Sequence, residues 1–176
     1  KTKYADDLKD VSFVSWNSDH VLLAGDKKLS GSGIMVQPGF PEMFSLTMLE
    51  GGRGALKDPT SLFIAQSLAQ ALFGDATPID KIVRLDNEQD MKVAGVYADL
   101  PHNTTFYGTK ILLPWDIKGN WMKTQTDWDN HCTQLFVQLN DNADFDKTSA
   151  KIKNLPTPYI KEWKEEILLQ PLDKLH

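Results

Sequence analysis

Hydrophobic residues along this chain fall into short runs, alternating or unbroken, that are bounded by glycine, proline, asparagine or aspartate. Runs of this length and punctuation are typical of β-strands, whereas a helix spaces its apolar residues three or four positions apart over a longer window. The pattern therefore predicts strands at 11–16, 21–23, 28–36, 82–85, 91–97, 111–115, 134–139 and 166–170.

Helical spacing is confined to a few segments. Residues 38–44 read as a compact turn of helix, and a helix through Leu72 begins with Ser67 as its N-cap and ends at Gly74. The preceding run, 61–65, fits either a short strand or the start of one long helix, because periodicity alone does not separate the two.

A second amphipathic helix is predicted at 143–155, entered at Asn142. Its inward face carries Phe145, Ile152 and Leu155, and its last turn is basic, which suits the helix dipole. Prolines 156 and 158 end it.

Glycines inside two of the strand patterns need their own explanation. The Ser30–Gly33 stretch lacks both a following helix start and the Lys-Ser/Thr pair of a phosphate-binding loop, so it predicts a bulged or edge strand. Gly95 lies within the run 91–97 and indicates a bulge or a close backbone approach.

Composition narrows the class of protein. With 176 residues, 41% of them hydrophobic, the chain can form one domain or two small subdomains that share a core. A net charge of −5 with scattered lysines argues against nucleic-acid binding. No apolar run reaches the roughly 20 residues that span a bilayer. Because the first residue is not methionine and the last residues, 172–176, follow an apolar run with no tapering tail, we expect an excised piece of a longer protein.

Residues equipped for chemistry are few. The single cysteine, Cys132, excludes an internal disulfide and a multi-cysteine zinc site, and its neighbour His131 would point to the opposite face of a strand. The G-x-S-x-G motif of a hydrolase is absent. Asp127, Asp129 and His131 alternate as possible cation ligands, but the glycine and the glutamate of a calcium loop are missing. The sequence thus assigns no catalytic residue, cofactor or metal.

Three tryptophans, Trp115, Trp121 and Trp128, lie in or beside a segment with no periodicity, 119–132. They could cover the core or present a surface to a partner protein. Core cover is the favoured interpretation, because tryptophan is large and usually at least partly buried.

The stretch from Leu56 to Pro101 is the most densely patterned part of the chain, and it resembles the MacB-like periplasmic core domain of ABC transporter permeases. Further matches lie around Phe40 and Glu50, in the strand at 135–139 and at 172–176, so the resemblance covers nearly the whole chain. One departure is clear: the family commonly has glycine after the Pro-Ile pair, where this chain has Asp80. The motif positions carried over as structural are Asp58, Pro59, Ala69, Phe73, Gly74, Pro78, Gly95, Val96 and Pro101.

The resemblance implies an α+β fold in two parts. Residues 1–50 and 131–176 would form a porter-like βαβ subdomain, and residues 51–130 a smaller, β-rich α/β subdomain inserted into it. It also favours a strand followed by a helix over one long helix at 61–73. The family domain normally begins with another strand, for which this chain shows no segment before Lys1.

The resemblance further implies a non-catalytic domain on the periplasmic side of a bacterial inner membrane, acting in export or envelope substrate handling. Its expected partners are membrane helices that flank the domain in the same permease, a cytoplasmic ABC ATPase, and a periplasmic adaptor or second permease subunit. An alternative within the superfamily is an FtsX- or LolC-like domain that binds a cell-wall hydrolase regulator or a lipoprotein. A different class altogether is a small metal-dependent envelope hydrolase that uses the 127–132 segment.

Overall fold

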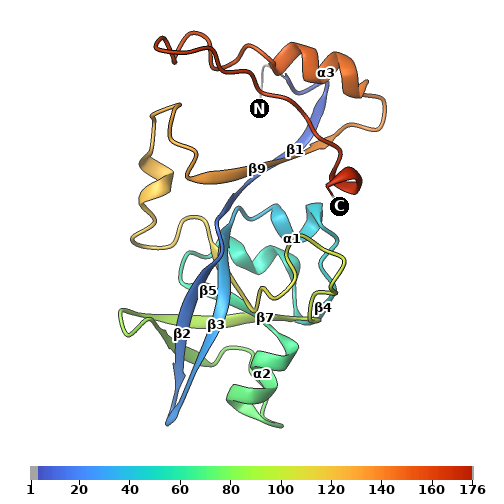
Figure 1. The fold of residues 1–176 in the computed structure, drawn as a ribbon. Coiled ribbons are helices and arrows are strands. Elements are labelled where there is room, and N and C mark those ends of the chain that lie inside the picture. Colours follow the sequence, from blue (N-terminus) through green and yellow to red (C-terminus); the bar gives the residue numbers. More distant parts are fainter. Residues whose placement is uncertain (1–3, 176) are drawn as a thin grey trace. The chain divides into compact units, whose positions relative to one another are not determined.

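The computed structural model describes residues 4–175. Lys1–Lys3 and His176 lie outside the described residues, although the predicted ranges 1–50 and 131–176 include them. The fold is mixed α+β, with more strand than helix (Figure 1). The strands are β1 (Leu8–Ser15), β2 (Ser18–Ala24), β3 (Lys27–Val36), β4 (Met48–Gly51), β5 (Ser61–Ala65), β6 (Ile82–Leu85), β7 (Gln89–Tyr97), β8 (Ile111–Pro114) and β9 (Thr133–Leu139). The α-helices are α1 (Phe40–Met43), α2 (Gln66–Phe73) and α3 (Phe145–Ile152).

The strands form one sheet in the order β2-β6-β7-β5-β8-β3-β1-β9. Strand β2 also pairs with β3, so six strands close into a ring. Strand β4 pairs with β7 beyond the part of β7 that β6 occupies. The long strand β7 therefore organises the central stretch, because β4, β5 and β6 all attach to it.

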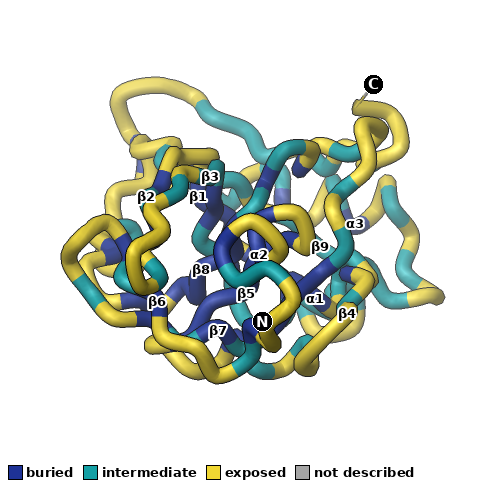
Figure 2. Tube along the Cα trace, turned by 90° about the horizontal axis from the view of Figure 1, so that it is seen from below, coloured by how far each residue is buried: buried dark blue, intermediate teal, exposed yellow. Residues whose placement is uncertain are grey.

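Two hydrophobic cores lie on the two faces of this sheet. Strand β5 is buried along its whole length, and its alternate residues contribute to different cores: Leu62 and Ile64 to one, Phe63 and Ala65 to the other. Helix α2 covers the first core with Leu68 and its neighbours. The second contains a cluster of phenylalanine rings at Phe40, Phe44, Phe106 and Phe136. Figure 2 shows β5 and β8 as buried tube and much of β4 as exposed.

Most predicted elements are confirmed, with borders shifted by a few residues. The run at 61–65 is the strand β5 followed directly by α2, not one long helix. The hairpin between β2 and β3 turns at Gly25, whose φ of 58° only glycine adopts readily. Gly95 follows a register shift between β5 and β7, which confirms the predicted bulge, and a Cβ on Gly95 would lie 2.7 Å from Phe63 Cδ1.

Strand β3 contradicts the prediction of a bulged or edge strand. It pairs with β1, β2 and β8, and its register with β2 runs without a shift from Gly33 to Lys27. Its glycines serve close packing, because a Cβ on Gly33 would lie 2.8 Å from the ring of His20 and 3.2 Å from Ile111. The missing side chain makes room for a neighbour.

At the end of the chain, one predicted element is wrong and another is confirmed with different bounds. Residues 166–170 form no strand. The amide of Ile167 donates instead to the carbonyl of Lys153, and that of Leu169 to the hydroxyl of Ser149, so single hydrogen bonds to the α3 region replace a ladder. Helix α3 is also shorter than 143–155, and its N-cap is Asp144, which accepts from the amide of Lys147.

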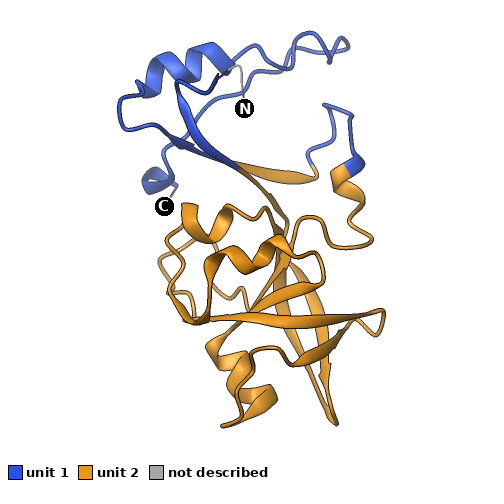
Figure 3. Ribbon diagram, turned by 180° about the vertical axis from the view of Figure 1, so that it is seen from behind, with its two compact units in different colours: residues 1–11, 124–131, 137–176 blue, residues 12–123, 132–136 orange. Residues whose placement is uncertain are grey.

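The chain divides into two compact units (Figure 3). Unit 1 comprises the residues up to Val11, Thr124–His131 and the residues from Val137 on, and unit 2 comprises Ser12–Lys123 and Cys132–Phe136. The predicted borders, 1–50 with 131–176 against 51–130, differ from the borders of these units and stay a prediction. Strands β2 and β3 lie within 1–50, but they are hydrogen-bonded to β6 and β8 and so group with the central stretch. The assignment of a porter-like and an inserted subdomain stays a prediction.

Candidate functional site

A groove of about 420 Å³ opens in unit 2 beside helix α2. Its walls are Leu49 and Glu50 of β4, Gln66, Ala69 and Gln70 of α2, and the loop 74–78, with Val96 of β7 as the remaining lining residue. We call it the α2–β4 groove. Its buried lining residues are the apolar Ala69, Pro78 and Val96, whereas its exposed lining is mostly polar but includes Leu49 and Ala76.

Four of the predicted motif positions line this groove: Ala69, Gly74, Pro78 and Val96. Gly74 ends α2 with a φ of 61°, and Pro78 is buried just beyond it, so the pair shapes the loop that walls the groove. Phe73 packs partly buried against the neighbouring core. These residues shape backbone and supply no reactive group.

The remaining motif positions are Asp58, Pro59, Gly95 and Pro101. Asp58 accepts from the amide of Thr60 at 2.9 Å and from its hydroxyl at 2.7 Å, which fixes the turn at Pro59 that leads into β5. These hydrogen bonds lower the pKa of Asp58. Gly95 lets β7 pass close to Phe63, and Pro101 follows the end of β7 in an exposed loop.

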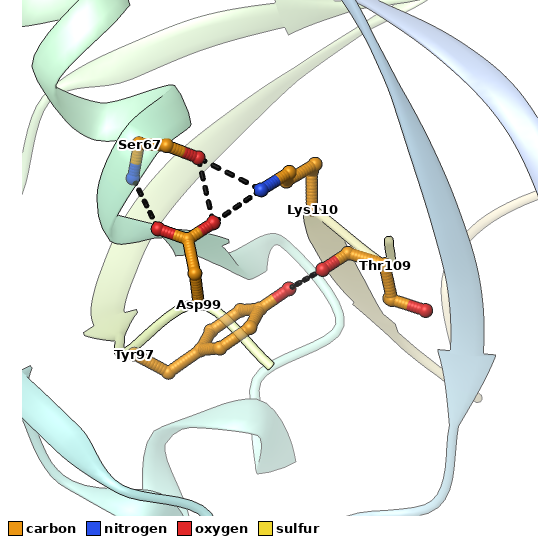
Figure 4. A network of polar contacts seen from close by, with 5 residues as sticks. All are labelled: Ser67, Tyr97, Asp99, Thr109 and Lys110. Atoms are coloured by element: carbon orange, nitrogen blue, oxygen red, sulfur yellow. Dashed lines mark hydrogen bonds and ion pairs between the residues drawn. The ribbon is translucent and has the colours of Figure 1, made fainter. Parts of the chain in front are cut away.

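A polar network anchors the N-terminal turn of α2 (Figure 4). Asp99 Oδ2 accepts from the amide of Ser67 at 2.9 Å, and Asp99 Oδ1 accepts from the Ser67 hydroxyl at 2.6 Å and from Lys110. Partial burial would raise the pKa of Asp99, but the hydrogen bonds from Lys110 and Ser67 bring it below its usual value. Beside this network, the buried Tyr97 hydroxyl donates to the carbonyl of Thr109 at 3.0 Å.

This network corrects the prediction that Ser67 is an N-cap. Ala65 occupies the N-cap position without a side-chain hydrogen bond, and Ser67 lies inside the first turn. The orphan amide of that turn is satisfied by Asp99, which comes from a different segment. Ser67 is not an activated nucleophile here either, since Lys110 is ion-paired with Asp99 and donates to the Ser67 hydroxyl rather than accepting its proton.

A second group of polar contacts, which no pattern in the sequence predicted, joins β2 to the β6–β7 turn. His20 Nδ1 lies 2.6 Å from Asp86 Oδ2, and His20 Nε2 lies 3.0 Å from Ser18 Oγ. The order serine, histidine, carboxylate is that of a hydrolase triad. However, Asp86 also accepts from the amide of Val21 and donates its own amide to the Val21 carbonyl, and the α2–β4 groove is lined by none of these residues. We interpret these contacts as a structural link, which we call the His20–Asp86 link, that holds β2 to the β6–β7 turn.

The three tryptophans differ in their surroundings. Trp115 is 9% exposed and stacks on Phe13, so it covers the core as favoured. Trp121 and Trp128 are 57% and 40% exposed, so core cover is wrong for these two. Trp128 stacks face to face on Tyr159 with ring centroids 4.3 Å apart. A role of the two exposed rings in partner binding stays a prediction.

The 127–132 segment brings together no metal site. His131 Nε2 lies 2.9 Å from Glu165 Oε1, and this contact lowers the pKa of Glu165. Within residues 4–175, no three histidine, cysteine, aspartate or glutamate side chains converge as metal ligands. Cys132 is half-buried. No helix among these residues has the length and apolar character needed to cross a bilayer.

Comparison with known proteins identifies the family. The model of the MacB-like periplasmic core domain matches residues 3–155. The chain belongs to this family. It is therefore a periplasmic domain of the MacB-like ABC transporter permease family, a family whose members are generally non-catalytic in this part. No curated protein sequence matches the chain.

Solved structures share the fold of this MacB-like domain at low sequence identity. A domain of a protein described as a permease, from Porphyromonas gingivalis, has a TM-score of 0.69 at 19% identity, covering 87% of this chain and 71% of that one. The periplasmic region of MacB from Actinobacillus actinomycetemcomitans has a TM-score of 0.68 at 15% identity, and the match covers 90% of this chain and 71% of that one. The extracellular domain of the noncanonic ABC-type transporter YknZ from Gram-positive bacteria has a TM-score of 0.61 at 17% identity, and the match covers 89% of this chain and 77% of that one.

Proposed function

We propose that this domain passes ATP-driven motion of a permease's membrane helices to export or to the handling of envelope substrates, and that it does so without chemistry of its own. Its partners would be membrane helices of the same permease, a cytoplasmic ATPase, and a periplasmic adaptor or a second permease subunit. The observation that carries the proposal is the family match over residues 3–155.

The division of the chain supports a mechanical role. Each unit is compact, and strands β1 and β9 each contribute residues to both. Hinge motions in proteins typically place the change in a few connecting residues and leave the packed bodies intact. The points where β1 and β9 pass from one unit to the other, near Ser12 and Val137, are the positions where such a change would occur.

The test is a distance measurement in the full-length permease with its ATPase, in lipid nanodiscs. Spin labels on exposed Asp26 in unit 2 and Lys147 in unit 1, in a Cys132→Ser background, report the separation of the units. We expect the distance distribution to shift by more than about 2 Å between the nucleotide-free and ATP-trapped states.

The matched control places both labels in unit 2, on Asp26 and Lys118. That distance should be the same in the two states. Identical distributions for the Asp26–Lys147 pair, in a permease that hydrolyses ATP, would refute the mechanical role.

A further inference from the structure

Strand β4 leaves one edge of the sheet unpaired beside the α2–β4 groove. It pairs with β7 on one side, and no other strand of residues 4–175 pairs with it. The unpaired side of such a strand offers backbone amides and carbonyls in a row, ready to bind an added strand. Leu49, Glu50 and Gly51 are exposed along this strand.

A bulge directs this strand toward the groove. The pairing with β7 shifts register between Met48 and Glu50, so an extra residue is accommodated there. In a regular strand, neighbouring side chains point to opposite faces, but here Leu49 and Glu50 both line the groove. Bulges that re-aim side chains in this way are frequent next to binding sites.

The chemistry of the groove favours a cationic peptide. Glu50 and Asp75 bring two carboxylates to its walls, and no lysine or arginine lines it. Within the described residues, neither carboxylate has an ion-pair partner. Gln66 and Gln70, one turn apart on α2, add amides that can donate to and accept from a peptide backbone.

We propose that the α2–β4 groove binds an extended segment of a partner protein, which pairs with the edge of β4 and places a lysine or arginine side chain between Glu50 and Asp75. Strand addition supplies the affinity through backbone hydrogen bonds, and the groove selects the alternate side chain that points into it. Identifying the partner as an envelope protein rests on the proposed function; the binding chemistry does not.

The first experiment titrates the 176-residue chain with blocked pentapeptides and follows backbone amide shifts by NMR. A peptide with a central lysine between valine and threonine residues should bind and perturb the amides of 48–51 and 74–78. The same peptide with central glutamate should bind at least about tenfold more weakly, because like charges meet in the groove. N-methylation of the lysine peptide at alternate amides should weaken it to a similar degree, because it blocks the edge hydrogen bonds.

Variants locate the site. Glu50→Gln and Asp75→Asn should each weaken the lysine peptide by about two- to fivefold, the range for an exposed charge pair. Glu88→Gln removes one carboxylate from the exposed β6–β7 turn, away from the groove, and should leave the affinity unchanged.

Other outcomes would overturn the proposal. These are equal affinity for spermidine and for the lysine peptide, equal affinity for the glutamate peptide, or shifts that lie outside 48–51 and 74–78. Dimerisation of the peptide-free chain through β4, seen as concentration-dependent shifts of the same amides, would assign the edge to a second copy instead. Peptide binding without nucleotide-driven motion of the units would refute the proposed function and leave this inference standing. Motion of the units without peptide binding would refute this inference and leave the proposed function standing.

Discussion

Asp80 stands where the resemblance led us to expect glycine, and the structure gives this aspartate a physical cost. Its φ is 63°, in the left-handed region that glycine enters freely and other residues enter at a cost. Aspartate tolerates this region better than most residues, and the amide of Asp80 is held by the carbonyl of Val93 at 2.9 Å. A glycine at this position would adopt the same backbone turn without that cost.

Replacing Asp80 by glycine should stabilise the domain. The variant removes the strain of a side chain at positive φ, and the contact of Asp80 with Lys92, at 3.8 Å and exposed, contributes little. We expect Asp80→Gly to raise the free energy of unfolding by about 0.5–1 kcal/mol and Asp80→Ala to lower it by about 1 kcal/mol. Urea unfolding followed by tryptophan fluorescence measures both. Equal stability of the glycine and alanine variants would contradict this account.

At the scale of the element, helix α2 depends on a partner that lies far from it in sequence. It begins without a side-chain cap of its own, and Asp99 from the segment after β7 completes its first turn. Lys110, just before β8, holds the same carboxylate. Three segments therefore meet at one charged group.

The stability from this anchor should depend on pH. The pKa of Asp99 is lower in the folded chain than its usual value. The contribution of Asp99 to the free energy of unfolding is therefore complete above the unfolded pKa of about 4, and it is lost as the pH falls through the folded pKa. Asp99→Asn should destabilise the domain at pH 6, by less than about 1 kcal/mol because the pair is partly exposed, and the difference from wild type should shrink toward pH 3. Urea unfolding between pH 6 and pH 3 measures it.

Lysine variants separate the ion pair from the cap. In the Lys110→Met variant, the free energy of unfolding should change less between pH 6 and pH 3 than in wild type. The Lys123→Met variant, changed at an exposed position elsewhere in unit 2, should keep the pH dependence of wild type. If wild type and Asp99→Asn lost stability in parallel as the pH fell, Asp99 would not be the group responsible.

The elements that the sequence predicted correctly are those with a local signal. The runs predicted as strands at 82–85 and 91–97 carry their structure in adjacent residues and are strands β6 and β7. The errors are contacts between distant segments. Ser67 had the chemistry of an N-cap but lost that role to Asp99, and 166–170 had the pattern of a strand but no neighbouring strand to pair with.

The candidate site shows the same limit. Its motif residues, such as Gly74 and Pro78, could be picked from the sequence because they punctuate the backbone. Glu50, Gln66 and Asp75 could not, since only the attachment of β4 to β7 brings Glu50 beside α2. The His20–Asp86 link likewise joins residues that lie 66 positions apart in the sequence. No spacing rule links such residues before the fold is known.

For the whole molecule, the two units differ in how much apolar surface they bury. Both hydrophobic cores lie in unit 2. In the described part of unit 1, the buried hydrophobic residues are Ile152 and Ile160. Since burial of apolar surface is the main source of stability, unit 1 has far less to hold it folded.

Hydrogen exchange should resolve this difference. Amides of α3 in unit 1 should exchange at least about tenfold faster than those of β5 in unit 2, because local opening of a weakly packed region costs less free energy. Ile152→Ala should accelerate exchange in α3 further and leave β5 unchanged, whereas Lys147→Ala, on the exposed side of the same helix, should alter neither. Exchange of α3 and β5 at one common rate, accelerated equally by Ile152→Ala, would mean that the chain opens as a single cooperative body. Two units that open independently, as we expect, can also change their mutual arrangement without unfolding, which is what a mechanical role requires.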